Sequence, residues 1–493
     1  MRTKSVEQSI RDTEDPEFKL NKSLGPLDLT VFGIGVIIGT GLFVLTGEAA
    51  ALYSGPAIAL SYVVAGVACA LAALCYAEFA SSVPVAGSAY TFSYASLGEF
   101  VAWLIGWDLI LEFTLGAATV AKGWSGYLVN VMELVGITVP PALYAAEGGG
   151  LSHDYIAVLV IIAVTAILVI GIKLSSQFNL VITAIKVLVT IFIIGFGVWF
   201  IDTANLTPFI PAPEPASGGY GTGIDAYLIP SILGIDTIFG VTGIFTGAAL
   251  VFFAYIGFDI VATTSEEARN PQRDIPIGIF ASLGICTVFY ILASLVFTGL
   301  VPYKDLATAA PAATALEATP FPAAQFVVSA AILVGLTVVC MILILGQSRV
   351  AFAMSRDNLL PRWFAEVHPT FRTPYRITII TGIVSAILTF SLPLTTLGEL
   401  VNIGTLAAFV LVSIGVLVLR RTQPDLPRAF RTPLVPYVPI AAAALCLFVM
   451  GFLTIGTWLR FLVWMGLGLI IYFAYSRSHS RLAQEDSSAN AEG

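Results

Sequence analysis

Two stretches of this sequence decide its fold: GIGVIIGTGLFVLTG at residues 33–47 and ALVFFAYIGFDIVATTSEEARNP at residues 249–271. Both are largely apolar, and both contain residues that interrupt a helix. The first holds five glycines, and the second places Gly257 two residues before Asp259. Because glycine weakens a helix by about 1 kcal/mol relative to alanine, each stretch is predicted to be a helix with a break in its middle.

The composition of the whole chain is that of a membrane protein. Of 493 residues, 57% are hydrophobic and 11% are charged, whereas soluble domains carry about 25% charged residues. The net charge of -8 argues against nucleic acid as a partner. The five cysteines lie in apolar runs without a C-x-x-C motif, so we expect small buried side chains rather than disulfides or metal ligands. No cofactor is expected.

A membrane-spanning helix needs about 20 mostly apolar residues, and twelve segments meet this requirement. These segments are 27–50, 56–81, 99–130, 155–172, 178–201, 241–267, 277–301, 325–353, 376–393, 398–419, 436–456 and 458–475. The third is long enough to predict a tilted helix or one that extends beyond the bilayer. The last two are separated by little more than Thr457. Residues 1–26 lack the features of a cleavable signal, and the tail after Tyr475 is expected to be disordered.

The positive charges predict the orientation of these segments. With the N-terminus in the cytoplasm, 19 of the 23 lysines and arginines fall in inner segments. Lys304 and Arg460 fall in outer loops, and Lys122 and Lys186 fall within spans. This excess predicts a multi-pass protein of the cell membrane with both termini in the cytoplasm.

The two breaks are five spans apart, which predicts a pair of inverted five-helix repeats. The predicted organisation is a cytoplasmic tail (1–26), a first repeat (27–201), an extracellular loop region (202–240), a second repeat (241–421), two further helices (436–475) and a cytoplasmic tail (476–493). The alternative interpretation of the glycines is close packing between uninterrupted helices.

A broken helix inside a membrane exposes backbone groups that can bind a ligand. Free N–H groups near residues 39–41, at the start of a half-helix, favour an anion. Carbonyl groups freed at residues 253–256 favour an ammonium group. An anion site facing a cation site fits the zwitterion of an α-amino acid.

Of the ionisable residues within the predicted spans, where a charge is costly and commonly functional, Glu112, Lys186 and Asp259 stand out. Lys186 is surrounded by Ile, Val and Leu, so it could gain and lose a proton during a transport cycle, or replace a bound metal ion as a fixed cation. The alternative for Lys186 is a static ion pair or a hydrogen bond between helices. For Glu112 the alternative is a packing hydrogen bond, and for Asp259 it is a cap on the broken backbone.

Three stretches carry a family resemblance: GIGVIIGTGLFVLTGEAA, FFAYIGFDIVATTSEEARNPQRDIPIGI and GQSRVAFAMSRDNLLP. Over roughly residues 20–475 the chain resembles the amino acid–polyamine–organocation transporters, and among them the cationic amino acid transporter branch. This resemblance implies an all-α membrane protein with the five-plus-five inverted repeat of the LeuT fold and two additional C-terminal helices.

The resemblance also implies a role for individual residues. The substrate carboxylate is expected on the backbone at residues 39–41, and the ammonium group on carbonyls of Ile37 or Ile38 and of residues 253–256. Phe253 would close over the substrate, and Glu112 would lie near its side chain. Lys186 would take the place of a sodium ion, which implies proton coupling or exchange without sodium. The expected substrate-binding residues are Ile37, Ile38, Gly39, Thr40, Gly41, Glu112, Phe253, Ala254, Tyr255, Ile256, Gly257 and Asp259.

The predicted function is sodium-independent, proton-coupled symport of an L-amino acid by alternating access. An exchanger and a non-transporting amino acid sensor remain alternatives, whereas an enzyme is disfavoured because no histidine lies in a span. The substrate stays open between cationic and small neutral amino acids. The eighth span reads GLTVVCM at 335–341, with bulky Val339 and Met341 and no carboxylate for a cationic side chain.

Overall fold

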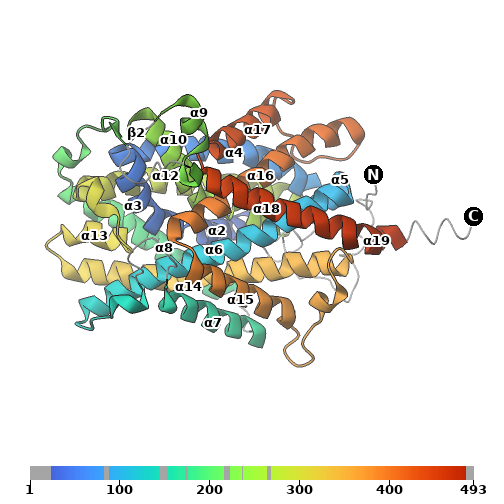
Figure 1. Ribbon diagram of the computed structural model, residues 1–493, viewed down its shortest axis with the longest axis horizontal. Helices are drawn as coiled ribbons and strands as arrows, with labels where there is room; N and C mark the ends of the chain where they lie inside the picture. The colour runs from blue at the N-terminus through green and yellow to red at the C-terminus, as the bar shows by residue number, and fades with distance from the viewer. Residues whose placement is uncertain are drawn as a thin grey trace, which may run out of the picture.

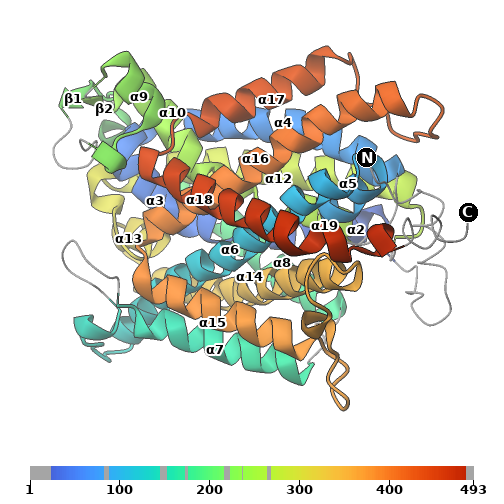
Figure 2. The same ribbon diagram turned by 45° about the vertical axis from the view of Figure 1, so that its right-hand side comes forward.

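The computed structural model describes residues 24–82, 88–144, 153–171, 176–215, 223–235, 237–263 and 268–484. The long helices run side by side along the longest axis of the molecule (Figures 1 and 2). In both views α3, α13 and β2 lie toward the left-hand end and α19 lies at the right-hand end. This parallel arrangement of apolar helices is that of an all-α polytopic membrane protein.

The first half of the described chain forms α-helices, with short 3-10 or π helices, marked η, between some of them. These elements are α2 (Pro26–Ile37), η1 (Gly41–Leu45), α3 (Thr46–Ala49), η2 (Ala50–Ser54), η3 (Gly55–Ala57), α4 (Ile58–Ser82), α5 (Ser88–Ser96), α6 (Glu99–Leu134), η4 (Pro141–Leu143), α7 (Tyr155–Ile170), α8 (Ser176–Gly197), η5 (Val198–Phe200) and η6 (Thr203–Leu206).

The second half begins with a small two-stranded sheet and continues with helices. Its elements are β1 (Glu214–Pro215), η7 (Gly223–Asp225), α9 (Leu228–Leu233), β2 (Thr237–Ile238), α10 (Gly240–Val251), η8 (Phe252–Tyr255), α11 (Phe258–Thr263), α12 (Pro271–Leu300), η10 (Tyr303–Leu306), α13 (Pro311–Glu317), α14 (Pro322–Arg356), η11 (Arg362–Ala365), α15 (Tyr375–Ser391), α16 (Leu394–Thr422), α17 (Tyr437–Met450), α18 (Ile455–Ile471), η12 (Tyr472–Ser476) and α19 (Arg477–His479). The strands are antiparallel, with Glu214 opposite Ile238.

Among the described residues, eight helical stretches are long and apolar enough to cross a membrane. Four shorter apolar helices are α2, α7, α15 and α17. Each of the twelve segments expected from the sequence overlaps helix in the structure. The 36 residues of α6 rise about 54 Å at 1.5 Å per residue, so this helix is longer than the hydrocarbon core of a bilayer, as the sequence predicts.

Two expectations about the C-terminal part were wrong. The boundary between the last two helices lies at residues 451–454 and not at Thr457, because Thr454 caps α18 by accepting a hydrogen bond from the Thr457 N–H. The tail is also ordered beyond Tyr475. Ser480 is fully buried and donates a hydrogen bond of 2.7 Å to Glu99, at the start of α6. Residues 1–23 and 485–493 of the two expected tails lie outside the described residues.

Both predicted breaks are present. The α2 helix ends at Ile37, Ile38 is extended with ψ 106°, and helix resumes at Gly41. In the second segment Ile256 is extended with ψ 132°, and Gly257 has φ +121°, in the region that favours glycine. A side chain at Gly257 would also meet Val36 at 2.6 Å. The two breaks therefore lie against each other.

The closest approach of the two broken segments is at Gly41. A Cβ atom placed there would lie 2.2 Å from the Cα atom of Ala254, which is closer than any real contact. Because neither backbone can retreat without moving its half-helices, the absence of a side chain at Gly41 sets the distance between the two breaks.

Gly41→Ala should therefore lower the stability of the folded protein by about 1–3 kcal/mol, the usual cost of overpacking. Gly39→Ala is the matched control, because a Cβ atom at Gly39 meets only side chains, at 3.6 Å or more. The measurement is the melting temperature of the purified protein in detergent. Equal melting temperatures for the two variants would contradict the close approach at Gly41.

Candidate functional site

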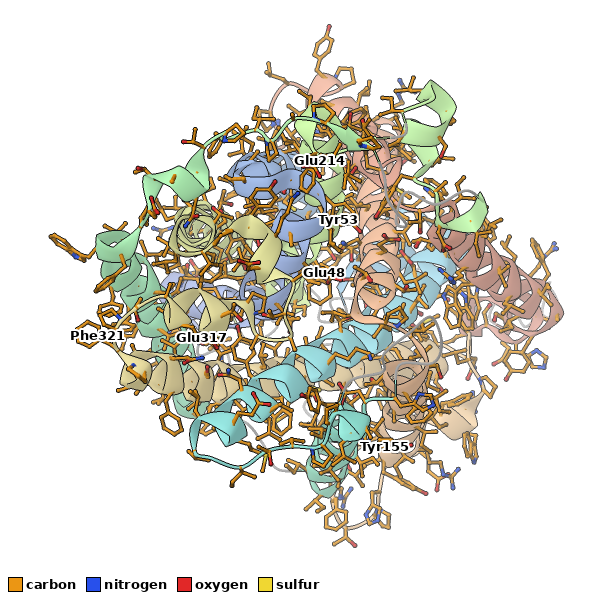
Figure 3. The ribbon with its side chains drawn as sticks, turned by 60° about the vertical axis from the view of Figure 1, so that its left-hand side comes forward. Glu48, Tyr53, Tyr155, Glu214, Glu317 and Phe321 are labelled. Atoms are coloured by element: carbon orange, nitrogen blue, oxygen red, sulfur yellow. The ribbon has the colours of Figure 1, made fainter. Side chains whose placement is uncertain are left out.

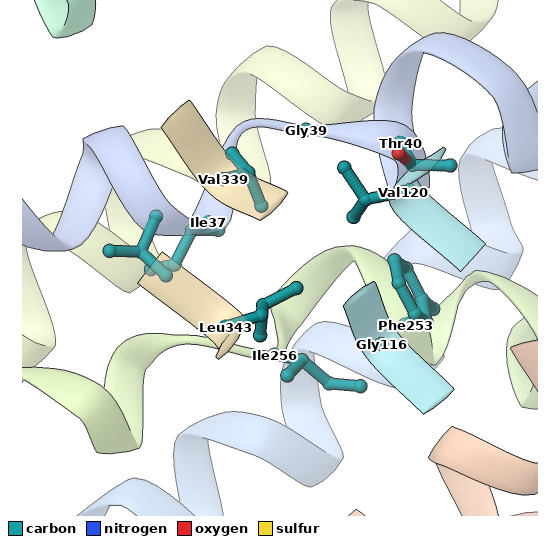
Figure 4. Close-up of a pocket in the computed structure, with 11 residues that line it drawn as sticks. Ile37, Gly39, Thr40, Gly116, Val120, Phe253, Ile256, Val339 and Leu343 are labelled. Atoms are coloured by element: carbon teal, nitrogen blue, oxygen red, sulfur yellow. The ribbon is translucent and has the colours of Figure 1, made fainter. Parts of the chain in front are cut away.

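A small pocket lies between the two breaks (Figure 4). Its walls come from α2 and the first break, from the second break, and from the two long helices α6 and α14. The lining residues are Val36, Ile37, Gly39, Thr40, Gly41, Gly116, Val120, Phe253, Ile256, Val339 and Leu343.

Six of the expected substrate-binding residues line this pocket: Ile37, Gly39, Thr40, Gly41, Phe253 and Ile256. Thr40, with its oxygen in view, lies above Phe253 on the right-hand side of Figure 4, and Val339 and Leu343 lie to their left. The other six expected substrate-binding residues do not line it: Ile38, Glu112, Ala254, Tyr255, Gly257 and Asp259. Lys186, the expected proton-coupling residue, does not line it either.

The first break supplies hydrogen-bond donors to the pocket. Within the described chain, no backbone hydrogen bond uses the N–H groups of Gly39, Thr40 or Gly41. This is what the first turn of a helix leaves unpaired. The Thr40 hydroxyl is also buried and makes no hydrogen bond among the described residues. Unpaired donors at the start of a half-helix form a site for an anionic group.

One carbonyl at each break shares a single tyrosine donor. The Tyr290 hydroxyl, on α12, lies 2.7 Å from the carbonyl oxygen of Ile37 and 2.7 Å from that of Ala254. A hydroxyl has only one proton to donate. At any moment, therefore, one of the two carbonyl oxygens lacks this donor and can accept a hydrogen bond from another group.

Lys186 is buried in α8, with 2% of its surface exposed, and its Nζ donates to the carbonyl of Gly35 at 2.7 Å. Its methylene chain passes over Gly335 of α14, where a Cβ atom would lie 2.7 Å from Cε. Within the described residues Lys186 forms no salt bridge. Of the two forms of the alternative, the structure shows the hydrogen bond between helices, which joins the lysine to the last turn of α2 just before the break.

The two acidic residues expected at the site lie beside the pocket. Asp259 accepts a hydrogen bond from the Gly257 N–H at 3.1 Å, so it caps the half-helix that follows the second break. Glu112 lies beside Thr405 of α16, with Asp108 and Asp259 nearby. One oxygen of Glu112 and both oxygens of Asp108 are buried without a partner among the described residues.

The apolar wall of the pocket contains the residues that sequence reasoning missed. They are Val36, Gly116, Val120 and Leu343, whereas Val339 had been noted for its bulk. Apolar residues in a membrane helix give no sign of which ones face a pocket. Spacing gives a partial signal: Gly116 and Val120 are four residues apart, and Val339 and Leu343 are four residues apart, so each pair shares one helix face.

Comparison with known proteins shows which family the chain belongs to. The family model described as amino acid permease matches residues 24–476, which is nearly the whole chain. The chain belongs to the amino acid permease family.

Three relatives show the range of this family. The chain is 44% identical to the branched-chain amino acid permease BcaP of Bacillus subtilis, over 98% of this chain and 99% of the relative. It is also 44% identical to a methylthioribose transporter of the same organism, over 94% and 95% of the two chains. It is 39% identical to the vacuolar cationic amino acid transporter 4 of Arabidopsis thaliana, over 86% of this chain and 68% of the relative. These names describe transporters, so this chain is a multi-pass membrane transporter and not an enzyme.

The bridging hydroxyl of Tyr290 leads to a test of stability. Tyr290→Phe should lower the free energy of unfolding by about 1–3 kcal/mol, because two buried carbonyl groups lose their shared donor. Tyr437→Phe, at a side chain that is 74% exposed, is the control and should leave stability unchanged. Melting temperatures in detergent compare the two. An unchanged Tyr290→Phe variant would mean that the hydroxyl does not connect the two breaks.

Proposed function

We propose that this protein is a secondary active transporter that carries neutral amino acids with apolar side chains across the cell membrane by alternating access. The observation that carries the proposal is that unused donors line the pocket close to two carbonyls that share one tyrosine donor. The N–H groups of residues 39–41 and the Thr40 hydroxyl suit a carboxylate. The carbonyls of Ile37 and Ala254 suit an ammonium group.

The membrane topology is part of the same proposal. We infer twelve spans, with α2 to α8 and α10 to α16 as two inverted repeats of five, followed by α17 and α18. The inference rests on breaks that are five spans apart and on the lysine and arginine count. Figure 3 looks onto the end of the molecule that we assign to the outside, where Glu214 and Glu317 lie. Lys304 in the same region pairs with Glu214 at 3.1 Å.

The pocket wall indicates the substrate class. Among the lining residues, the Thr40 hydroxyl is the only side-chain group that can form a hydrogen bond, and no lining side chain is charged. A lysine or arginine substrate would bury its charge against Val120, Val339 and Leu343 without a partner, which is costly. A valine, leucine or isoleucine side chain would instead bury apolar surface there.

One of the relatives is named for methylthioribose, which makes a neutral sugar derivative the second candidate substrate. A sugar presents several hydroxyl groups, and a binding site normally pairs each of them with a polar group. Apart from the Thr40 hydroxyl, the side chains that line this pocket offer apolar surface. The geometry therefore favours an amino acid over methylthioribose.

Gly116→Ala should narrow this substrate range. A Cβ atom at Gly116 would lie 3.4 Å from Leu343, an ordinary contact, so the variant should fold while the pocket loses the volume of one methyl group. Uptake of leucine and isoleucine relative to alanine should fall by about tenfold or more, the usual effect of one misplaced methyl group. Competition for uptake into proteoliposomes measures it.

The control is Gly346→Ala in α14, where a Cβ atom meets Phe113 at 3.6 Å and does not face the pocket. It should leave the ranking of substrates unchanged. Competition by arginine or methylthioribose, but not by valine, leucine or isoleucine, would overturn the proposed substrate class. Binding of amino acids without any flux would favour a sensor instead.

We further propose that Lys186 couples uptake to protons without sodium, since its buried amine contacts α2 and has no carboxylate partner among the described residues. Lys186→Met keeps the chain that packs on Gly335 but removes the charge. Uptake driven by an inward proton gradient should fall at least about tenfold, while exchange of labelled for unlabelled substrate continues. Proton-driven uptake at the unchanged rate would contradict coupling through Lys186. If the rate of uptake by the wild type does not depend on the proton gradient, the protein is an exchanger.

A further inference from the structure

A second side chain holds a broken helix in the way that Lys186 does. Asn402 lies in α16 and is fully buried. Its Nδ2 atom donates to the carbonyl oxygens of Ala249 at 2.7 Å and of Leu250 at 2.9 Å. Both carbonyls belong to the last turn of α10, directly before the second break, as Gly35 belongs to the last turn of α2.

The two contacts occupy equivalent places in the chain. Lys186 and Asn402 are 216 residues apart, and their acceptors Gly35 and Ala249 are 214 residues apart. Gly35 lies two residues before the end of α2, and Ala249 lies two residues before the end of α10. Each donor comes from the last helix of its repeat, α8 or α16. A donor and an acceptor with nearly the same offset are what a duplicated structural element produces.

The chemistry of the two donors differs in one respect. The Asn402 amide has two N–H donors and places them on two carbonyls, while its Oδ1 atom is buried without a partner among the described residues. A lysine can release its proton, whereas an amide cannot do so at any physiological pH. One contact can therefore be broken by deprotonation, and the other cannot.

We propose that Asn402 is a positioning residue for transport, the uncharged counterpart of Lys186, which holds the outer half-helix of the second break. The inference rests on the proposed function, because the inverted repeats direct α2 to the cytoplasm and α10 to the outside. Figure 2 shows the two half-helices toward opposite ends of the molecule. The outer side then opens by breaking the amide contacts without a proton, and protons act only at the contact of Lys186 on the inner side.

Hydrogen exchange of backbone amides tests this assignment without substrate. In Asn402→Leu, residues 240–255 should exchange about tenfold faster than in the wild type, while residues 26–38 stay unchanged. Lys186→Met should show the reverse pattern. The matched control is Ser413→Ala, which removes a buried hydroxyl of the same helix that donates within it to Phe409. Unchanged exchange at 240–255 in Asn402→Leu overturns the proposal.

A second variant separates a donor from a space-filling side chain. In Asn402→Asp the shape is kept, but only the protonated acid can donate to Ala249 or Leu250. Relative to the wild type, residues 240–255 of this variant should be better protected from exchange at low pH and less protected at high pH. Glu112, Asp108 and Asp259 lie near this part of α16 and are present in both proteins, so the comparison removes their effect. A variant that follows the wild-type pH profile overturns the proposal.

Transport then distinguishes Asn402 from Lys186. Asn402→Leu should slow exchange and proton-driven uptake by the same factor, whereas Lys186→Met should slow proton-driven uptake alone. A loss confined to proton-driven uptake in Asn402→Leu overturns the uncharged role. If residues 240–255 respond as expected in a protein that carries no amino acid, the proposed function fails while the contact of Asn402 with α10 stands.

Discussion

The structure depends on the contact between the backbones of Gly41 and Ala254. Each of these residues belongs to an interrupted helix, and a side chain at Gly41 would occupy the position of the Ala254 Cα atom. An unwound backbone in a membrane is tolerated only where protein or a water-filled cavity surrounds it. Because the two breaks touch, each shields the other, and residues of both line the same pocket. The pocket is therefore a consequence of how the breaks are accommodated.

Tyrosine hydroxyls from unbroken helices compensate the backbone around the breaks. Tyr290 reaches the carbonyls of Ile37 and Ala254, Tyr127 donates to the carbonyl of Phe43 at 2.7 Å, and Tyr62 donates to that of Gly41 at 3.1 Å. All three tyrosines are fully buried. Side-chain donors of this kind stabilise carbonyls that a continuous helix would have paired. They do not pair the N–H groups of the first break, and those donors stay unpaired among the described residues.

The breaks were predictable from the sequence, and the wall of the pocket was not. Glycines at 33–47 and at 257 act on the backbone wherever they stand, so their effect is local. A side chain faces the pocket only if its helix has the right rotation and depth. Glu112, Gly116 and Val120 are four residues apart and share one face of α6. The pocket contacts Gly116 and Val120 but not Glu112, which lies one turn, about 6 Å, further along the axis. Glu112 thus differs from the lining residues in depth, which no helical pattern records.

Main-chain groups and side chains have different roles around the pocket, which bears on how members of one family transport different substrates. Backbone groups at residues 39–41 and the carbonyls of Ile37 and Ala254 suit the parts that every α-amino acid shares. Substitution leaves these groups in place, because they belong to the main chain. The wall at Gly116, Val120, Val339 and Leu343 consists of side chains, and substitution can change its volume and polarity freely. Relatives are named for branched-chain amino acids, cationic amino acids and methylthioribose. Side chains in such a wall can account for different substrates with the fewest substitutions. A substrate without a carboxylate and an ammonium group gives up the backbone contacts, so its wall must supply polar partners that this chain lacks among its described lining residues.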